Sequence, residues 1–172
     1  MRVYALCIGV SGPYTALTAA QQTEFKDRFN MTRYERNLYV GVSNLMHAGL
    51  GLFARRHMKE GTTLGVFKGK WYPREKYNSG AVPNALWWTF DHPKYRETFV
   101  PDPHCILNFA NDTSKPGTKL LPNNYMKDKG KLDLNAECVL DGLDHRALVL
   151  VLLKDVQPGD EIFFSYGKVF WK

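Results

Sequence analysis

The residues best suited to chemistry lie near the end of the chain, where a tyrosine follows an apolar run. A turn at residues 157–160 leads into residues 162–164, which are branched and aromatic and are typical of a short, fully buried strand. Tyr166 comes where this strand runs out, and Gly167 allows a sharp backbone turn after it. Such a tyrosine could aim its hydroxyl into a pocket with aromatic walls and hydrogen-bond a polar group there. The alternative is that the aromatic residues of this tail serve only as packing: Phe163, Phe164, Tyr166, Phe170 and Trp171.

A second feature is a pair of glycines, Gly49 and Gly51, that flank Leu50 a few residues after a predicted strand at 38–42. This spacing indicates a backbone that turns tightly or that another group approaches closely. The pattern does not continue as a dinucleotide-binding or phosphate-loop sequence. Taken alone, it predicts an unusual backbone geometry and no particular ligand.

The composition bounds the class of protein. The 172 residues are 44% hydrophobic and 23% charged, which predicts one soluble globular domain with a sizeable core. The net charge of +6 permits contact with nucleic acid or acidic surfaces but does not require it. No apolar run approaches the roughly 20 residues of a membrane helix, and residues 3–10 are predicted to be a first strand rather than a signal peptide core. We therefore expect an intracellular protein, nuclear or cytoplasmic, with no membrane contact.

The cysteines and histidines do not indicate a metal centre. The three cysteines are odd in number and far apart, which favours a reducing compartment over a disulfide framework or a zinc site. The histidines fit no ligand spacing and are predicted to be surface or turn residues: His47, His57, His92, His104 and His145. We therefore expect no metal ion.

Short strands separated by glycine turns dominate the pattern and predict a mainly β fold, a β-rich α+β class without a βαβ rhythm. Residues 1–33 are predicted to be an N-terminal extension with one short amphipathic helix, and residues 34–172 to be the main domain. A pair of strands is expected at 135–140 and 146–153.

Two segments are predicted to interrupt these strands. Residues 71–103, rich in Pro, Trp and Tyr, show no clean period and are expected to be an irregular insert. Residues 112–131 combine Pro and Gly with five lysines and are expected to be a long basic loop, more consistent with a solvated face than with a binding patch.

Three segments in combination resemble the SET domain family of protein lysine methyltransferases. The first is Gly-Leu-Gly-Leu-Phe-Ala at 49–54, the second is Phe-Ala-Asn-Asp at 109–112, and the third is Gly-Asp-Glu-Ile-Phe-Phe-Ser-Tyr-Gly at 159–167. Their order and spacing also agree, and the resemblance covers about residues 36–171. It implies a SET-type fold of short sheets around a pseudoknot-like threading of the C-terminal segment.

The resemblance also implies a site for S-adenosylmethionine. Gly49, Leu50 and Gly51 would line this site with backbone groups, and Asn111 would hold the amino-acid end of the cofactor. Two further residues would belong to the cofactor site: Asp112 and Trp171.

The catalytic assignments come from the same resemblance. Tyr166 falls on the family's catalytic tyrosine. Phe164 falls on an aromatic position that helps to set how many methyl groups are added, and phenylalanine there is associated with di- or trimethylation. Phe163 and Phe170 would line the substrate channel, to which Trp87 or Trp88 could contribute.

The sequence departs from the family pattern in two places. Asp112 stands where the family most often has histidine, and no cysteine cluster follows Trp171, so the resemblance is to a member without the zinc-binding module. For the second asparagine of the family's middle segment, Asn135 is the first choice, and Asn123 and Asn124 are the alternatives.

Aromatic walls have a chemical purpose in this interpretation. Methyl transfer from a sulfonium to an amine is an in-line displacement that needs a free lone pair on nitrogen. The pKa of a free lysine is about 10.4, so nearly all of it is protonated at neutral pH. An apolar channel beside a cationic sulfonium disfavours the ammonium form through desolvation and like charge. Aromatic residues around Tyr166 would therefore promote the reaction as well as fill space.

The function that the resemblance implies is a protein lysine N-methyltransferase that uses S-adenosylmethionine and acts on histone lysine. A non-histone protein lysine is the close alternative as substrate. A SET-like binding module without turnover is a second alternative, supported only by Asp112. The last is a nucleic-acid-binding protein, with weak contact through the lysines of the basic loop: Lys115, Lys119, Lys127, Lys129 and Lys131.

Overall fold

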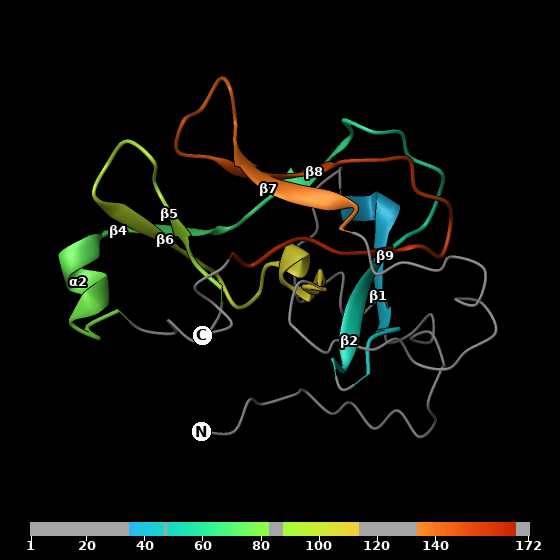
Figure 1. Ribbon diagram of the computed structural model, residues 1–172, viewed down its shortest axis with the longest axis horizontal. Coiled ribbons are helices and arrows are strands. Elements are labelled where there is room, and N and C mark those ends of the chain that lie inside the picture. The colour runs from blue at the N-terminus through green and yellow to red at the C-terminus, as the bar shows by residue number, and fades with distance from the viewer. Residues whose placement is uncertain (1–34, 47, 83–87, 114–133, 168–172) are drawn as a thin grey trace.

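A computed structural model describes residues 35–46, 48–82, 88–113 and 134–167, and this part of the chain is mainly β, as predicted (Figure 1). Its strands pair antiparallel in three sheets with the orders β1-β2-β9, β3-β8-β7 and β4-β6-β5. The strands are β1 (Leu38–Val42), β2 (Leu50–Ala54), β3 (Thr63–Val66), β4 (Gly69–Pro73), β5 (Phe90–Asp91), β6 (Glu97–Pro101), β7 (Ala136–Leu140), β8 (Leu148–Leu152) and β9 (Glu161–Ile162). The helices are η1 (Glu35–Asn37), α2 (Arg74–Asn78) and η2 (Ile106–Phe109), of which η1 and η2 are 3₁₀ helices.

The C-terminal segment is enclosed by segments from much earlier in the chain. β9 pairs with β2, so that Ile162 lies opposite Leu52. The next residue, Phe163, forms a parallel bridge with Asn111 and accepts a hydrogen bond from the Asn135 backbone N–H at 3.1 Å. Three distant segments therefore contact residues 161–163, and the pseudoknot-like threading that the resemblance implies stays a prediction.

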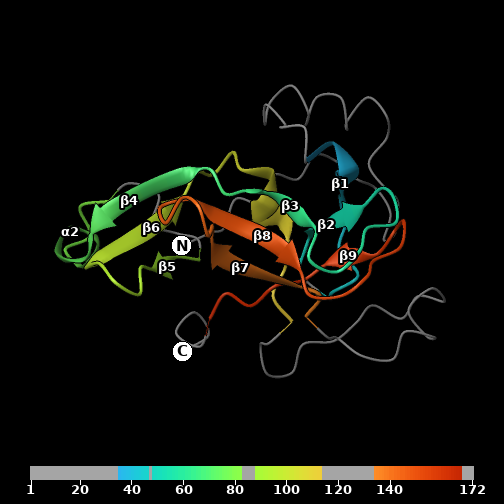
Figure 2. The ribbon, with the colours of Figure 1, turned by 90° about the horizontal axis from the view of Figure 1, so that it is seen from above.

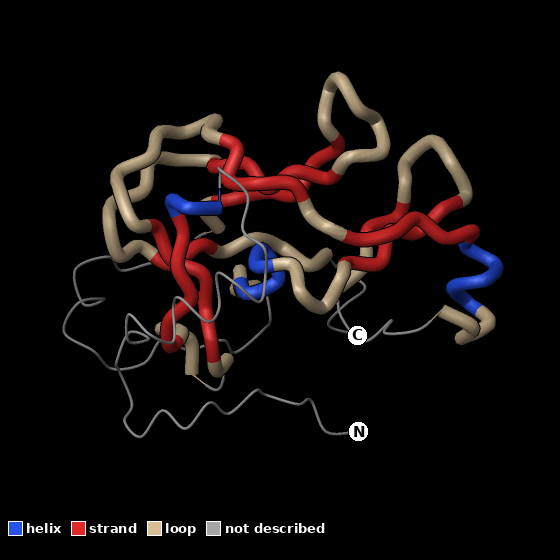
Figure 3. Tube along the Cα trace, turned by 180° about the vertical axis from the view of Figure 1, so that it is seen from behind, coloured by secondary structure: helices blue, strands red, loops and turns tan. Residues whose placement is uncertain are grey.

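The middle sheet, β3-β8-β7, lies between the other two when the molecule is seen from above (Figure 2). β7 and β8 confirm the strand pair predicted from residues 135–140 and 146–153. Leucine and valine alternate along β8, and most of the strand is buried. Leu148 and Leu150 have no exposed surface. Near the centre of the molecule, η2 adds Ile106 and Leu107 to the same core (Figure 3). Burial of these apolar side chains is the main source of stability in such a small domain.

The prediction of an irregular insert at residues 71–103 was wrong. This region contains most of β4, all of α2, β5 and β6, and these strands form the outer sheet. Trp71 packs edge-on against Phe90 and Phe99, with ring centroids 6.4 and 5.3 Å apart. Because β5 is only two residues long and the contacts are made by aromatic residues of all three strands, no alternating pattern reveals this sheet in the sequence.

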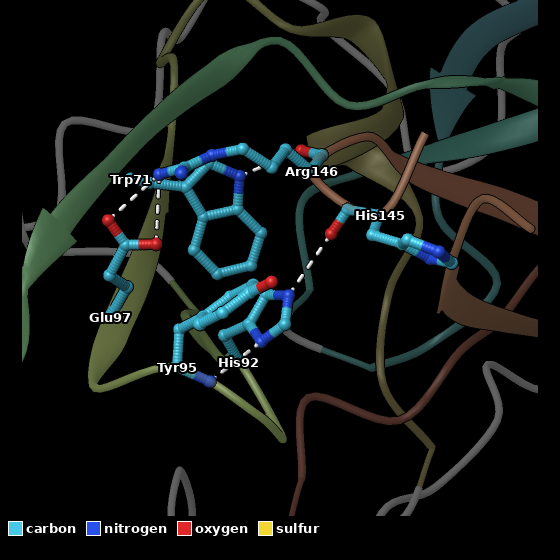
Figure 4. A network of polar contacts seen from close by, with 6 residues as sticks. All are labelled: Trp71, His92, Tyr95, Glu97, His145 and Arg146. Carbon is cyan, nitrogen blue, oxygen red and sulfur yellow. Dashed lines mark hydrogen bonds and ion pairs between the residues drawn. The ribbon is translucent and has the colours of Figure 1, made fainter. Parts of the chain in front are cut away.

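A group of side chains, here called the outer clamp, joins the outer sheet to the loop between β7 and β8 (Figure 4). Trp71 Nε1 donates to the carbonyl of Arg146 at 2.7 Å, and Arg146 Nη2 forms an ion pair with Glu97 at 2.8 Å. The clamp comprises Trp71, His92, Tyr95, Glu97, His145 and Arg146.

His92 lies in the turn between β5 and β6, within the prediction that the histidines are surface or turn residues, but only 4% of it is exposed. Its Nδ1 accepts hydrogen bonds from the backbone N–H groups of Lys94 and Tyr95 at 3.0 and 3.1 Å. Since Nδ1 is an acceptor, the proton of the neutral ring is on Nε2, which donates to the carbonyl of His145 at 3.1 Å. The ring is buried because it fills the space between Trp71 and Tyr95.

Several predictions lie outside the described residues. These are the N-terminal strand and helix, His47, Trp87, Asn123, Asn124, the lysines of the basic loop, Phe170 and Trp171. Of the residues predicted to form the basic loop, the structure describes only Asp112 and Thr113, and both are buried. Within the described segments, none of the helices has the length and apolar character needed to cross a membrane.

Candidate active site

The two glycines of the Gly-Leu-Gly segment have separate structural roles. Gly49 has a φ of +77°, a backbone conformation that favours glycine, and it precedes β2. Gly51 lies within β2, and a Cβ atom there would collide with the carboxylate of Glu161. The sequence predicted either a tight turn or a close approach, and the chain uses one glycine for each.

Glu161, the first residue of β9, is the centre of a buried polar network. Only 4% of it is exposed, although it carries a carboxyl group. Its Oε1 accepts hydrogen bonds from Ser43 Oγ at 2.6 Å and Asn111 Nδ2 at 3.1 Å, while its Oε2 accepts one from the Asn44 backbone N–H at 2.7 Å. Burial raises the pKa of Glu161, and these donors oppose that shift because they stabilise the ionised form.

The side-chain amide of Asn111 has a defined orientation. Its Nδ2 donates to Leu50 O at 3.0 Å and to Glu161 Oε1 at 3.1 Å, and it also lies 3.1 Å from Ser43 Oγ. A backbone carbonyl and a carboxylate can only accept hydrogen bonds, so nitrogen must be the atom that faces them. The amide oxygen points the other way and forms no hydrogen bond within the described part of the chain.

Asn135 fixes the backbone of the C-terminal segment. It is 7% exposed, and its Nδ2 donates to the carbonyl of Glu161 at 2.7 Å. Its Oδ1 accepts the backbone N–H of Phe163 at 2.8 Å. One side chain thus satisfies a donor and an acceptor of a buried strand that has few ladder partners.

Tyr166 is held by both its backbone and its hydroxyl. The backbone N–H donates to Asp112 Oδ2 at 2.7 Å, and the hydroxyl donates to the carbonyl of Ala110 at 2.8 Å. Burial raises the pKa of Tyr166, and the negative charges of Asp112 and Glu161 raise it further. The phenol therefore stays protonated near neutral pH, and its oxygen keeps lone pairs with which it can accept.

Tyr166 packs against a cluster of buried aromatic rings that belongs to the core. Phe164 is fully buried, and its ring centroid lies 5.1 Å from that of Tyr166 and 5.3 Å from that of Trp88. Phe67 completes the group, with its centroid 4.6 Å from Trp88 and 5.7 Å from Phe164. Trp88 Nε1 is buried and has no hydrogen-bond partner among the described residues, which is uncommon for a tryptophan in a core.

Most of the predicted site residues that the structure describes meet in one place. Asn111 contacts Leu50, and Asp112 contacts Tyr166. Phe163 is 5% exposed and lies beside Asn111 in the parallel bridge. Gly49, Leu50 and Gly51 lead into β2, and Phe164 packs on Tyr166. Trp171 and Phe170 are outside the described residues.

Two members of the network were missed from the sequence. Ser43 and Glu161 are 118 residues apart. Glu161 belongs to the segment at 159–167 that carries the family resemblance but was given no role there, and Ser43 lies in none of the three segments. A signal did exist for Glu161, because a charged residue directly before the buried run at 162–164 has to be satisfied by donors. Nothing comparable marked Ser43.

Comparisons with known proteins agree with this geometry. The sequence matches the family model of the SET domain over residues 49–167. No curated protein matches the chain in sequence. Among solved structures, the chain is similar to a candidate histone methyltransferase of Plasmodium falciparum, with 17% identity, a TM-score of 0.51 and coverage of 79% of this chain and 97% of that one.

The chain is also similar to a humanized mutant of the Chaetomium thermophilum Polycomb Repressive Complex 2 bound to the inhibitor GSK126. The identity is 19% and the TM-score 0.53, with coverage of 76% of this chain and 15% of that one. A similar match is to an active polycomb repressive complex 2 in the basal state, with 19% identity, a TM-score of 0.52 and coverage of 76% and 15%. At these identities the likeness concerns the fold, and it spans only a small part of the polycomb chains.

Proposed function

The chain belongs to the SET domain family, whose members are protein lysine methyltransferases, and from this premise we propose that it is an S-adenosylmethionine-dependent protein lysine N-methyltransferase that acts on histone lysine. The single observation that carries the proposal is the convergence of Tyr166, Asn111 and Phe164 around the C-terminal segment. Asn111 belongs to the family motif at 109–112, and Phe164 and Tyr166 belong to the motif at 159–167.

The polar residues of the site suit the proposed methyl donor. S-adenosylmethionine, when bound, supplies a methyl group on a cationic sulfonium sulfur. The amide oxygen of Asn111 has no partner within the described residues, so it can accept a hydrogen bond from the ammonium of an amino-acid group. We assign the cofactor site to Gly49, Leu50, Gly51, Asn111, Asp112 and Trp171.

Tyr166 is proposed to align the substrate amine. Its hydroxyl donates to Ala110 O at 2.8 Å, and a phenolic oxygen that donates its proton in this way is also of a type that accepts an N–H, here one from a lysine side chain. Because burial raises the pKa of Tyr166, the phenol keeps its proton near neutral pH and no phenolate is present to deprotonate the amine, so its proposed role is orientation.

The aromatic group around Phe164 is proposed to favour the neutral amine. The rings of Phe67, Trp88 and Phe164 are buried and pack together, and desolvation would lower the pKa of a lysine held beside such an apolar wall. A neutral nitrogen held there would be able to attack a sulfonium methyl group in line, with the electron pair of the broken carbon–sulfur bond left on sulfur. Phenylalanine at 164 is consistent with di- or trimethylation, and Phe163 and Phe170 are proposed to line the channel.

A transfer assay tests this proposal. Wild-type protein is incubated with S-adenosylmethionine labelled in its methyl group and with either core histones or a cell lysate. Tyr166→Phe and the matched variant Tyr95→Phe are assayed in parallel, because Tyr95 is 45% exposed and belongs to the outer clamp. Label on histones with wild type and Tyr95→Phe, but not with Tyr166→Phe, is the expected result.

Other outcomes distinguish the alternatives. Label only on lysate proteins would identify a non-histone substrate. Cofactor binding without any label would indicate a SET-like binding module that lacks turnover. If wild-type protein neither bound nor used S-adenosylmethionine, the proposed function would be wrong.

A further inference from the structure

The carboxylate of Glu161 accepts hydrogen bonds from three donors, one of which, Asn111, is assigned to the proposed cofactor site. Ser43 Oγ and Asn111 Nδ2 share Oε1, while the Asn44 N–H uses Oε2. Ser43 is 2% exposed, so water cannot replace its hydroxyl easily. A buried charge at this position is costly unless every donor around it is aligned.

This charge has a definite effect on Asn111. Ser43 Oγ gives its hydrogen to Glu161 and receives the Leu45 N–H at 3.0 Å, so the hydroxyl has a set direction. Two acceptors, Glu161 and the Leu50 carbonyl, then hold both hydrogens of the Asn111 amide. With the nitrogen held on one side, the amide oxygen is directed to the other side.

We propose that Glu161 is a positioning residue for the methyl donor: it holds the Asn111 amide with its oxygen toward the ammonium of the donor's amino-acid group. This inference rests on the proposed function, because it needs Asn111 to contact that group. Glu161 itself does not contact the ligand. Gly51 belongs to the same device, since any side chain there would displace the carboxylate.

The variant Glu161→Gln tests the inference while preserving shape. Glutamine replaces one carboxylate oxygen by an NH₂ group. In either orientation of the glutamine amide, this NH₂ group faces at least one of the three groups that donate to the carboxylate in the wild type. The Asn111 amide loses its charged partner and can rotate. Binding of a ligand that carries the amino-acid group should therefore weaken selectively.

Two probes separate the amino-acid group from the rest of the ligand. S-adenosylhomocysteine carries it, and 5′-methylthioadenosine is the same adenosine thioether without it. By titration calorimetry, we expect wild type to prefer S-adenosylhomocysteine, and Glu161→Gln to lose about tenfold or more of that preference, the usual contribution of a hydrogen bond to a charged group. Binding of 5′-methylthioadenosine should change little.

A double-mutant cycle with Asn111→Ala identifies the route of the effect. If Glu161 acts through Asn111, adding Glu161→Gln to Asn111→Ala causes no further loss of preference. A further loss of the same size would mean that the charge acts on the ammonium directly, and would overturn the positioning role.

Two more variants control for folding. Thr98→Val removes a buried hydroxyl in the outer sheet, where Thr98 Oγ1 donates to Asp91 at 2.7 Å, and should leave the preference unchanged. Ser43→Ala keeps the carboxylate but removes one of its donors, so a smaller loss of preference is expected, and this variant decides the question if Glu161→Gln does not fold.

The contrary results are distinct. Equal weakening of both probes, or no change in their ratio, would overturn the inference while leaving the proposed function intact. A wild type without any preference for S-adenosylhomocysteine would overturn the inference, and a wild type that bound neither probe and did not use S-adenosylmethionine would overturn the proposed function as well.

Discussion

The network around Glu161 and the outer clamp both join distant parts of the chain through polar groups, but they are built differently. In the first, a carboxylate that is 4% exposed is surrounded by neutral donors. In the second, Arg146 and Glu97 form an ion pair whose side chains are 56% and 23% exposed. Water can replace the lost contacts of this ion pair, but it has little access to the network around Glu161.

This difference explains where the cost of a substitution should fall. A buried group that loses its partner pays its full desolvation penalty, whereas an exposed ion pair contributes little because solvent screens both charges. The network can therefore hold the proposed site rigidly, and the clamp serves to dock the outer sheet. The following substitutions compare the two regions, from the largest expected effect to the smallest.

The largest effect is expected at Tyr166. Tyr166→Phe should lower the rate of methyl transfer by about a hundredfold or more, because an aligned hydrogen-bonding group near the reacting atoms is lost. Since burial and the Asp112 carboxylate raise the pKa of Tyr166, the hydroxyl does not ionise between pH 7 and about pH 9. The loss should therefore be the same across that range in a pH–rate profile. A loss that disappears at alkaline pH would contradict this assignment.

Asn135 should dominate the stability of the network. Asn135→Ala leaves the Glu161 carbonyl and the Phe163 N–H buried without a partner, and should destabilise the protein by about 2–4 kcal/mol. The measurement is urea denaturation followed by circular dichroism. Asn108→Ala is the matched control, since its amide donates to Asp102 O at an exposed position and should cost about 1 kcal/mol or less. Equal costs for both variants would remove the contrast in burial.

The two glycines before and within β2 should respond differently. Gly51→Ala forces Glu161 to move and should cost about 1–3 kcal/mol by overpacking, with a reduced preference for S-adenosylhomocysteine. Gly49→Ala meets no neighbouring atom but strains a positive φ, which should cost about 1 kcal/mol. Thermal melts and the two-probe titration measure these effects. Gly142→Ala, in open space on the β7–β8 loop, should change neither.

The smallest effect is expected in the outer clamp. Glu97→Gln removes the ion pair with Arg146 and should lower stability by about 0.2–1 kcal/mol, an effect that added salt should reduce further. Denaturation at low and high ionic strength provides the test. A cost comparable to that of Asn135→Ala would mean that the clamp is as important to the fold as the buried network.

The elements that the sequence predicted well are those with a local signal. β1, β7 and β8 are continuous apolar or alternating runs of five residues, so their strand character can be read directly. Tyr166 and Asn111 were placed together by their resemblance to a family pattern rather than by any local property. The outer sheet escaped prediction because one of its strands, β5, has only two residues and because aromatic contacts between the strands leave no period.

The polar network shows a further limit of a single sequence. Which of Asn123, Asn124 and Asn135 belongs to the site depends on which one reaches residues 161–163, and only the fold reveals that Asn135 does so. Ser43 lies in the connection between β1 and β2, and Glu161 is the first residue of β9. The two side chains meet because β2 pairs with β9. Contacts over such separations depend on topology, which periodicity does not encode.

The most direct test of lysine methylation by this protein is to locate the transferred methyl group. Wild-type protein and Tyr166→Phe are incubated with core histones and S-adenosylmethionine that carries a deuterated methyl group, and the products are analysed by tandem mass spectrometry. Deuterated methyl groups on lysine Nζ atoms are expected with wild type only. Label on another residue type, or equal label with Tyr166→Phe, would contradict a Tyr166-dependent lysine methyltransferase.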